Sequence, residues 1–324
     1  MSFWYSRTIV SYLLLPFTGL FALVTTMRRL AYRLGWLRSE HAGVPTIVVG
    51  NLSVGGNGKT PVVIWLCEIL TAAGFKPGVI SRGYGGKAQH YPLIVDQHTS
   101  GAQAGDEPVL IYHRCQCPVV VSPSRIDAAR LLRQSYQVDV IISDDGLQHY
   151  ALQRDIEIVV VDGERRFGNG WLMPSGPLRE TRQRLESVDL IINNGGQIQG
   201  DEVAMSLIAA DPTPVTDAIA AFDKTKYGTH VNACAGIGHP PRFFKTLDEL
   251  GFNVAKGVPF ADHHAFDEAE IKALEQTLPL FMTEKDAVKC RDFALTQSWY
   301  VPVTAAIDAA VADLIIAKLR ETSC

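Results

Sequence analysis

The stretch Thr46–Thr60 reads TIVVGNLSVGGNGKT, and it decides the fold of this 324-residue chain. Its first five residues, Thr46–Gly50, are an apolar, β-branched run typical of a buried strand. A glycine-rich loop follows, and Pro61 then suits the first turn of a helix, where the missing N–H of proline is harmless. A strand, a glycine-rich loop and a helix in this order form the context in which backbone N–H groups bind phosphate.

The octet Ser53–Thr60 nearly matches the phosphate-binding pattern G-x-x-x-x-G-K-[ST], although Ser53 replaces the first glycine. We expect Lys59 to reach the β- and γ-phosphates of ATP and the Thr60 hydroxyl to ligate Mg²⁺. The alternative is a glycine-rich turn with an incidental lysine, and the strand–loop–helix context argues against it. The predicted nucleotide-binding residues are Ser53, Val54, Gly55, Gly56, Asn57, Gly58, Lys59 and Thr60.

Short apolar runs rich in β-branched residues recur after this loop. Such runs are typical of strands buried on both faces, as in parallel sheets. Two stretches between them, Val62–Ala73 and Arg125–Gln134, have helical patterns. The sequence therefore predicts a doubly wound, mostly parallel α/β sheet of the P-loop type. Besides Thr46–Gly50, the expected strands are Gly78–Ser81, Pro118–Ser122, Val138–Ser143, Ile156–Asp162 and Leu190–Asn193.

A smaller α/β unit is expected after Asp211–Thr216, where two prolines indicate a linker. It should contain a strand at Val231–Ala235, a helix at Pro241–Leu250, and a further helix that begins at Asp267 with Glu270 as its capping-box partner. We therefore expect three parts, which are an N-terminal membrane-associated helix in residues 1–38, a P-loop domain in 39–212 and a smaller C-terminal domain in 213–324.

The N-terminal segment Ile9–Met27 contains no charged side chain, and as a helix it would be about 28 Å long. One arginine precedes it and arginines at 28, 29, 33 and 38 follow it, a distribution that argues against a cleaved signal peptide. A helix that spans the bilayer and a helix that lies on its surface both stay open, because Pro16 and Gly19 weaken a straight span. A buried core helix is the remaining alternative, and we expect contact with the membrane.

Charged side chains follow two of the expected strands. Asp144 and Asp145 come directly after Val138–Ser143, the arrangement that holds a metal ion at the carboxyl edge of the sheet in P-loop proteins. Arg82 follows the strand Gly78–Ser81 among glycines, which suits phosphate binding. The alternatives are an ordinary Asp-Gly turn for the acids and an exposed flexible turn for the arginine.

Two further loops carry groups suited to proton transfer. Asp106 lies in the acidic loop Gly105–Pro108, which taken alone is typical of a solvated turn. His263 follows Asp262 in the loop before the Asp267 helix, and a lone histidine is more often structural. Histidine beside an acid is a recurrent design for a general base. The spacing alone leaves open whether Asp106 meets His263.

Composition excludes some classes of partner and of site. The formal net charge is −4, and no block of basic residues exists beyond the first forty, so a nucleic-acid partner is not expected. The six cysteines form no C-x-x-C pair, and the pair Cys115 and Cys117 lacks a second half elsewhere in the sequence. We expect these cysteines to be reduced thiols in a cytosolic protein body.

The chain resembles the tetraacyldisaccharide 4′-kinase family, which acts in lipid A biosynthesis. The resemblance rests on seven motifs that occur in the same order along nearly the whole chain. Apart from the P-loop each motif is weak, but their order is highly specific. Ser at position 53 departs from the general P-loop pattern and looks like this family's own form. The matching segments are Ser53–Thr60, Ser81–Gly85, Gly105–Pro108, Asp144–His149, Pro174–Glu180, Asp262–His263 and Thr283–Lys289.

The resemblance implies phosphate transfer from ATP to the 4′-hydroxyl of a tetraacylated glucosamine disaccharide 1-phosphate. It implies work at the cytoplasmic face of the bacterial inner membrane, on a lipid A precursor, without an obligate protein partner. Asp106 would be the base, coupled to His263 across a domain cleft, with Lys59 and Asp145 also catalytic. The implied metal ligands are Thr60, Asp144, Asp145 and Glu180, and the implied substrate-binding residues are Arg82, Arg125 and Gln148.

Two other functions compete with this one. Another P-loop enzyme, such as an ATP-dependent ligase or synthetase, would consume ATP only with a carboxylate substrate. A membrane-tethered nucleotide-binding adaptor would bind ATP without turnover, and it leaves Asp106 and His263 unexplained. A GTPase is disfavoured because no N-K-x-D stretch occurs in the chain.

Overall fold

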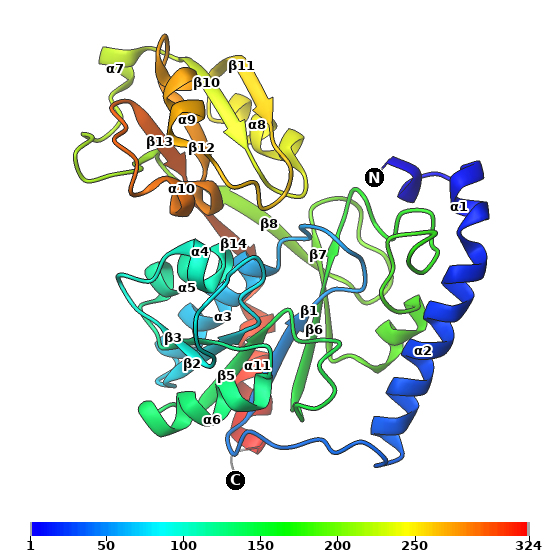
Figure 1. Cartoon of the computed structure of the whole chain (residues 1–324). Helices are drawn as coiled ribbons and strands as arrows, with labels where there is room; N and C mark the ends of the chain where they lie inside the picture. The colour runs from blue at the N-terminus through cyan, green and yellow to red at the C-terminus, as the bar shows by residue number, and fades with distance from the viewer. Residues whose placement is uncertain (1, 323–324) are drawn as a thin grey trace.

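The computed structural model describes residues 2–322, which form two α/β lobes with a long helix along one side (Figure 1). The large lobe is built on a nine-stranded sheet of order β14-β8-β7-β6-β1-β5-β2-β4-β3. All neighbouring pairs are parallel except β3 with β4 and β14 with β8. Its strands are β1 (Thr46–Gly50), β2 (Pro77–Ser81), β3 (Leu93–Val95), β4 (Val119–Val121), β5 (Val140–Asp144), β6 (Ile156–Asp162), β7 (Leu190–Asn194), β8 (Val203–Ala209) and β14 (Val303–Ile307).

Helices cover both faces of this sheet, as a doubly wound fold requires. One core is formed by α3 (Lys59–Ala72), α5 (Asp106–Cys115) and α11 (Ala309–Thr322) against one face, and α6 (Arg125–Ser135) packs on the other. The central strands β1, β2, β5 and β6 are buried along their whole length, which explains their continuous apolar runs. The predicted mostly parallel α/β sheet is confirmed. A short helix, α4 (Gly101–Ala104), precedes α5.

The small lobe has a five-stranded sheet of order β11-β10-β12-β13-β9, in which only β9 runs antiparallel to its neighbour among the described residues. Phe281 and Trp299 are fully buried at its centre. Its strands are β9 (Thr213–Pro214), β10 (His230–Ala235), β11 (Asn253–Pro259), β12 (Leu280–Thr283) and β13 (Ser298–Val301), and its helices are α7 (Lys224–Tyr227), α8 (Pro240–Glu249), α9 (Glu268–Glu275) and α10 (Glu284–Cys290).

Two details of the small lobe differ from the sequence-based expectation. Strand β14 pairs with β8 and α11 packs on the large sheet, so the chain returns to the large lobe before its end instead of staying in the small lobe through 324. Asp267 does cap α9, accepting a hydrogen bond from Ala269 N, but Glu270 forms no capping box with it. Glu270 instead pairs with His264 at 3.0 Å.

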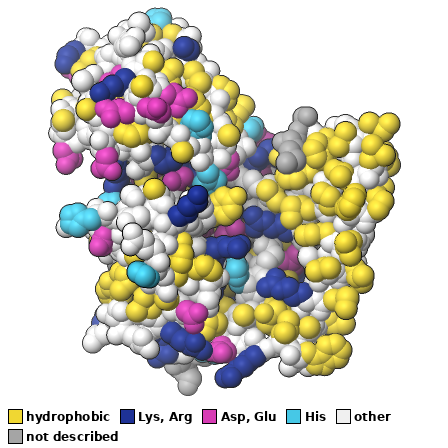
Figure 2. Space-filling model, in the orientation of Figure 1, with side chains coloured by type: hydrophobic (Ala, Val, Ile, Leu, Met, Phe, Trp, Pro, Cys, Tyr) yellow, Lys and Arg dark blue, Asp and Glu magenta, His cyan; other side chains and the backbone are white. Residues whose placement is uncertain are grey.

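The N-terminal segment forms α1 (Ile9–Leu13) and α2 (Leu15–Arg33), with the break beside Pro16, after a short 3-10 turn, η1 (Ser2–Trp4). Helix α2 touches the large lobe through Thr18 Oγ1, which donates to Ser175 Oγ at 2.7 Å. No residue of α2 is buried, and Figure 2 shows hydrophobic side chains gathered over α1 and α2. Within residues 2–322, no helix combines the length and the hydropathy that crossing a bilayer demands.

Candidate active site

The loop between β1 and α3 is shaped as a cradle for phosphate. Gly58 has a φ of +92°, and a Cβ at this position would lie 2.2 Å from Asn194 Nδ2, so a larger residue would be strained and would displace the Asn194 side chain. Asn194 Nδ2 donates to the carbonyl oxygen of Asn57 at 3.0 Å. Asn57 Nδ2 in turn donates to Ser53 Oγ at 2.9 Å. These contacts hold the loop from behind, which leaves its remaining N–H groups available to a ligand.

Lys59, the first residue of α3, lies at the acidic edge of the sheet. Its Nζ is 3.4 Å from Asp145 Oδ1, and Arg179 Nη1 lies 3.2 Å from both oxygens of the same carboxylate. Burial alone would raise the pKa of Asp145, but the charges of Lys59 and Arg179 outweigh burial and hold that pKa below its ordinary value. Asp145 is therefore a carboxylate at neutral pH, positioned beside the phosphate cradle.

Asp144 has a different environment from its neighbour. It is 1% exposed and accepts a hydrogen bond from Ser81 Oγ at 3.0 Å, while its Oδ1 is buried without a partner. Burial, and then the negative charges of Glu107 and Asp145, raise the pKa of Asp144 to about 7. An unpartnered carboxylate oxygen at the end of a strand, beside a phosphate cradle, is suited to a hard cation.

Asp106 and His263 meet, although they come from different lobes. Asp106 is the first residue of α5, and its Oδ2 lies 3.4 Å from His263 Nδ1. The other ring nitrogen, Nε2, lies 3.2 Å from Lys285 Nζ. His263 has a φ of +61°, and its ring packs edge-on against Tyr84 with 5.0 Å between the ring centroids. The pair is thus fixed by contacts on both sides.

Lys285, at the start of α10, joins the two lobes beside this pair. Its ammonium group lies 3.1 Å from Glu107 of the large lobe and 3.1 Å from Asp262 of the small lobe. Burial alone would lower the pKa of Lys285, but the two carboxylates outweigh burial and raise it. The lysine therefore stays charged and holds the loop that carries His263 against α5.

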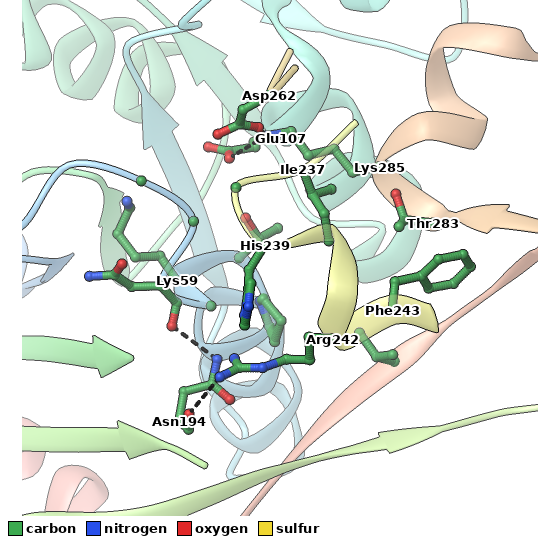
Figure 3. A pocket seen from close by; sticks show the side chains of 18 of the residues that line it. Lys59, Glu107, Asn194, Ile237, His239, Arg242, Phe243, Asp262, Thr283 and Lys285 are labelled. Atoms are coloured by element: carbon green, nitrogen blue, oxygen red, sulfur yellow. Dashed lines mark hydrogen bonds and ion pairs between the residues drawn. The ribbon is translucent and has the colours of Figure 1, made fainter. Parts of the chain in front are cut away.

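A cavity of about 520 Å³ lies between the lobes and connects these parts. The P-loop from Val54 to Thr60 forms one wall, and His263 and residues of α8 and α10 form the opposite wall. Figure 3 shows Glu107, Asp262 and Lys285 together at one end of the cavity, with Asn194 and Arg242 at the other end. The volume falls in the range of small-molecule sites.

The structure places the expected substrate-binding residues around the acidic loop. Arg82 is exposed at the end of β2. Arg125 is 3% exposed, and its Nη2 donates to the carbonyl oxygen of Asp144 at 2.9 Å. Gln148 donates to the carbonyl oxygen of Asn51 at 3.2 Å. Arg125 thus positions the acidic loop in this conformation, and its expected contact with substrate stays a prediction.

Glu180, which is expected among the metal ligands, engages other side chains through one oxygen, while its Oε1 is buried without a partner. Its Oε2 accepts a hydrogen bond from the Tyr150 hydroxyl at 2.7 Å and lies 3.5 Å from Arg184 Nε. Within the part of the chain that the structure describes, no hydrogen bond or ion pair joins it to Asp144 or Asp145. The neighbouring residue, Arg179, is the one that reaches the acidic edge.

Sequence reasoning missed the residues that connect the P-loop to the small lobe. Arg165 donates to the carbonyl oxygens of Gly56 and Gly238, and its Nε donates to Asp162 Oδ2 at 2.8 Å. Arg242 Nη2 reaches Asp162 Oδ1 at 3.4 Å from α8. The available signal was Asp162 at the end of a buried strand, the same pattern that identified Asp144.

A phosphate cradle, a buried acid at the sheet edge and a cavity closed by a second lobe define a nucleotide-binding protein of the P-loop class. A crystal structure of LpxK from Aquifex aeolicus in complex with ATP is similar, with a TM-score of 0.80, 26% identity, and coverage of 96% of this chain and 100% of that one. A family model described as tetraacyldisaccharide-1-P 4′-kinase matches residues 10–320, and this chain belongs to that family.

Curated relatives extend over the whole chain. The tetraacyldisaccharide 4′-kinase of Tolumonas auensis is 58% identical over 98% of this chain and 96% of its own length. Those of Aeromonas salmonicida and Psychromonas ingrahamii are 58% and 53% identical, over 98% and 100% of this chain and 95% and 100% of their own lengths. The resemblance inferred from the seven motifs is therefore confirmed.

Proposed function

We propose that this chain is a kinase that transfers the γ-phosphate of ATP to the 4′-hydroxyl of a tetraacylated glucosamine disaccharide 1-phosphate in lipid A biosynthesis. One observation carries the proposal in the structure. Lys59 and His263 line the same cavity from opposite lobes, and His263 contacts Asp106. A triphosphate in the P-loop would therefore face a proton acceptor across one cavity.

The chemistry follows from these positions. A sugar hydroxyl is a poor nucleophile at neutral pH, so its proton passes to the Asp106–His263 pair as the oxygen bonds to the γ-phosphorus. The bond from that phosphorus to the β,γ-bridging oxygen breaks, and ADP leaves. A positioned base contributes roughly 10² to 10⁴ to such a rate. Lys59 and the loop N–H groups align the phosphates and offset their charge.

The donor set fits Mg²⁺ at the edge of the sheet. The unpartnered Oδ1 of Asp144 and the hydroxyl of Thr60, which lines the cavity, would hold the ion, with Asp145 beside them. When bound, the ion would neutralise charge on the phosphate oxygens. Glu180 keeps one oxygen for the ion, because Tyr150 and Arg184 engage its Oε2 while its Oε1 is buried without a partner.

We further propose that α1 and α2 lie on the cytoplasmic surface of the inner membrane. Support comes from the exposed side chains of Leu13, Phe17, Leu20 and Met27, and from the arginines that follow them. An acceptor with four acyl chains stays in the bilayer, so an enzyme held at the same surface meets it there.

A transfer assay with radiolabelled ATP tests the function. The acceptor is a phosphorylated, acylated glucosamine disaccharide in detergent, and the product should carry one added phosphate. Lys59→Ala should abolish the transfer while circular dichroism shows an intact fold. Full activity in Lys59→Ala would remove the P-loop assignment, and ATP consumption only with a carboxylate substrate would favour a ligase instead.

A further inference from the structure

Three cysteine thiols meet in the large lobe, away from the cavity. Cys67 lies on α3, Cys115 is the last residue of α5, and Cys117 precedes β4. Their three Sγ atoms lie within 4.8 Å of one another, and those of Cys67 and Cys117 are 3.9 Å apart. Cys115 and Cys117 form a C-x-C pair that has no matching second pair of cysteines in the sequence. The fold brings a third thiol to them, from a helix about fifty residues earlier in the chain.

The spacing of the sulfur atoms suits a shared metal ion. With metal–sulfur bonds of about 2.3 Å, the sulfurs of a three-coordinate thiolate site lie about 4.0 Å apart. A disulfide needs about 2.05 Å between its sulfurs, roughly half the distance between Cys67 and Cys117. All three cysteines are free thiols in this structure. The cluster is therefore spaced for coordination and not for a covalent bridge.

The surroundings restrict the kind of ion. Among the described residues, no histidine, aspartate or glutamate joins the three thiols, so the protein offers a purely sulfur, three-coordinate set. Thiolate ligands select soft ions such as Cu(I), whereas Zn²⁺ in structural sites is almost always four-coordinate. Cys67 and Cys117 are buried in the apolar core, and the partly exposed Cys115 provides a path of entry.

We propose that Cys67, Cys115 and Cys117 form a binding site for a soft monovalent ion, with Cu(I) as the fitting example. Each coordinated thiol releases its proton to solvent, and no oxidation is involved. The bound ion joins α3 to the end of α5, the helices that begin with Lys59 and Asp106. Because the ion binds only the folded arrangement, it should stabilise the large lobe against unfolding.

The test is a titration of the reduced, full-length protein with acetonitrile-stabilised Cu(I) under anaerobic conditions, in competition with a chromogenic Cu(I) chelator. We expect one ion per chain, a sulfur-to-copper charge-transfer band, and a rise in the thermal unfolding midpoint. Cys117→Ser should lose the ion, the band and the thermal shift. Cys290→Ser, which removes a buried thiol in the small lobe, should keep all three.

Three results would overturn the proposal. The first is no stoichiometric binding to the wild-type protein, and the second is binding that Cys117→Ser leaves unchanged. The third, from a parallel titration, is preference for Zn²⁺ over Cu(I), which would remove the three-coordinate assignment. If circular dichroism shows that Cys117→Ser does not fold, Cys115→Ser replaces it, because that side chain is partly exposed and its loss leaves the core filled.

Discussion

Ser53 shows how a single residue can depart from a motif without loss of its geometry. This serine stands where the general P-loop pattern has glycine, and it pairs with Leu178 in an isolated antiparallel bridge. Its φ is not positive, so a side chain causes no backbone strain there. The hydroxyl accepts a hydrogen bond from Asn57, which gives the serine a positive role in holding the loop.

Gly58 is a glycine of this loop whose replacement should cost both backbone strain and a steric contact. Gly58→Ala should weaken ATP binding about tenfold or more, because it adds left-handed strain and places a methyl group against Asn194. Calorimetric titration with ATP measures the effect. Gly74→Ala is the matched control, since Gly74 has a φ of +90° at the end of α3 but open space around it. Equal losses of affinity in both variants would contradict a steric role for Gly58.

Asp106 is the residue that we propose as part of the proton acceptor. Asp106→Asn keeps the shape of the side chain but removes the proton acceptor, so kcat should fall about a hundredfold or more. Affinity for ATP should change little, because Asp106 does not line the P-loop wall. Asp127→Asn, on the exposed surface of α6, is the control and should retain full turnover. Parallel losses in turnover and ATP affinity would argue against a base.

Among the elements, the central strands of the large sheet could be predicted and its edge strands could not. Strands β1 and β6 have the predicted limits, because a strand buried on both faces must be apolar throughout. Strands β3, β8 and β14 were missed, since they lie at or next to the sheet edges and only some of their residues are buried. Such segments carry a weak pattern, and only tertiary pairing identifies them.

Helix α2 leads to a prediction about membrane binding. Leu20 and Leu23 are 61% and 57% exposed on this helix, and each should contribute roughly 1.5 kcal/mol or more if it enters the lipid. The double substitution Leu20→Glu and Leu23→Glu should therefore weaken binding to anionic vesicles about tenfold or more, as measured by co-sedimentation. Leu314→Glu is the control, because Leu314 is 59% exposed on α11. If the double variant sediments with the vesicles as the wild type does, this face of α2 is not the membrane-binding surface.

At the scale of the whole molecule, the position of one lobe relative to the other decides whether the site is complete. The chain crosses between the lobes twice, and the two crossings are joined by a hydrogen bond of 2.9 Å from Ala210 N to the carbonyl oxygen of Pro302 (Figure 1). Beside the P-loop, Arg165 bonds carbonyl oxygens of both lobes. No sequence pattern predicts these contacts, because they depend on how two separately folded units are placed.

The contact between Gly56 and Gly238 gives the last prediction. A Cβ at Gly238 would lie 2.4 Å from Gly56 N, a backbone atom that cannot rotate away, so Gly238→Ala must move the P-loop and the small lobe apart. The φ of Gly238 is not positive, so the variant should still fold. Separation draws His263 away from the nucleotide, and phosphate transfer should fall about tenfold or more. Gly257→Ala is the control, because its Cβ would meet only side-chain atoms, at 3.5 Å. Small-angle scattering should show a larger radius of gyration for Gly238→Ala and not for Gly257→Ala. If Gly238→Ala keeps wild-type transfer and unchanged scattering, closure at this contact is not needed for activity.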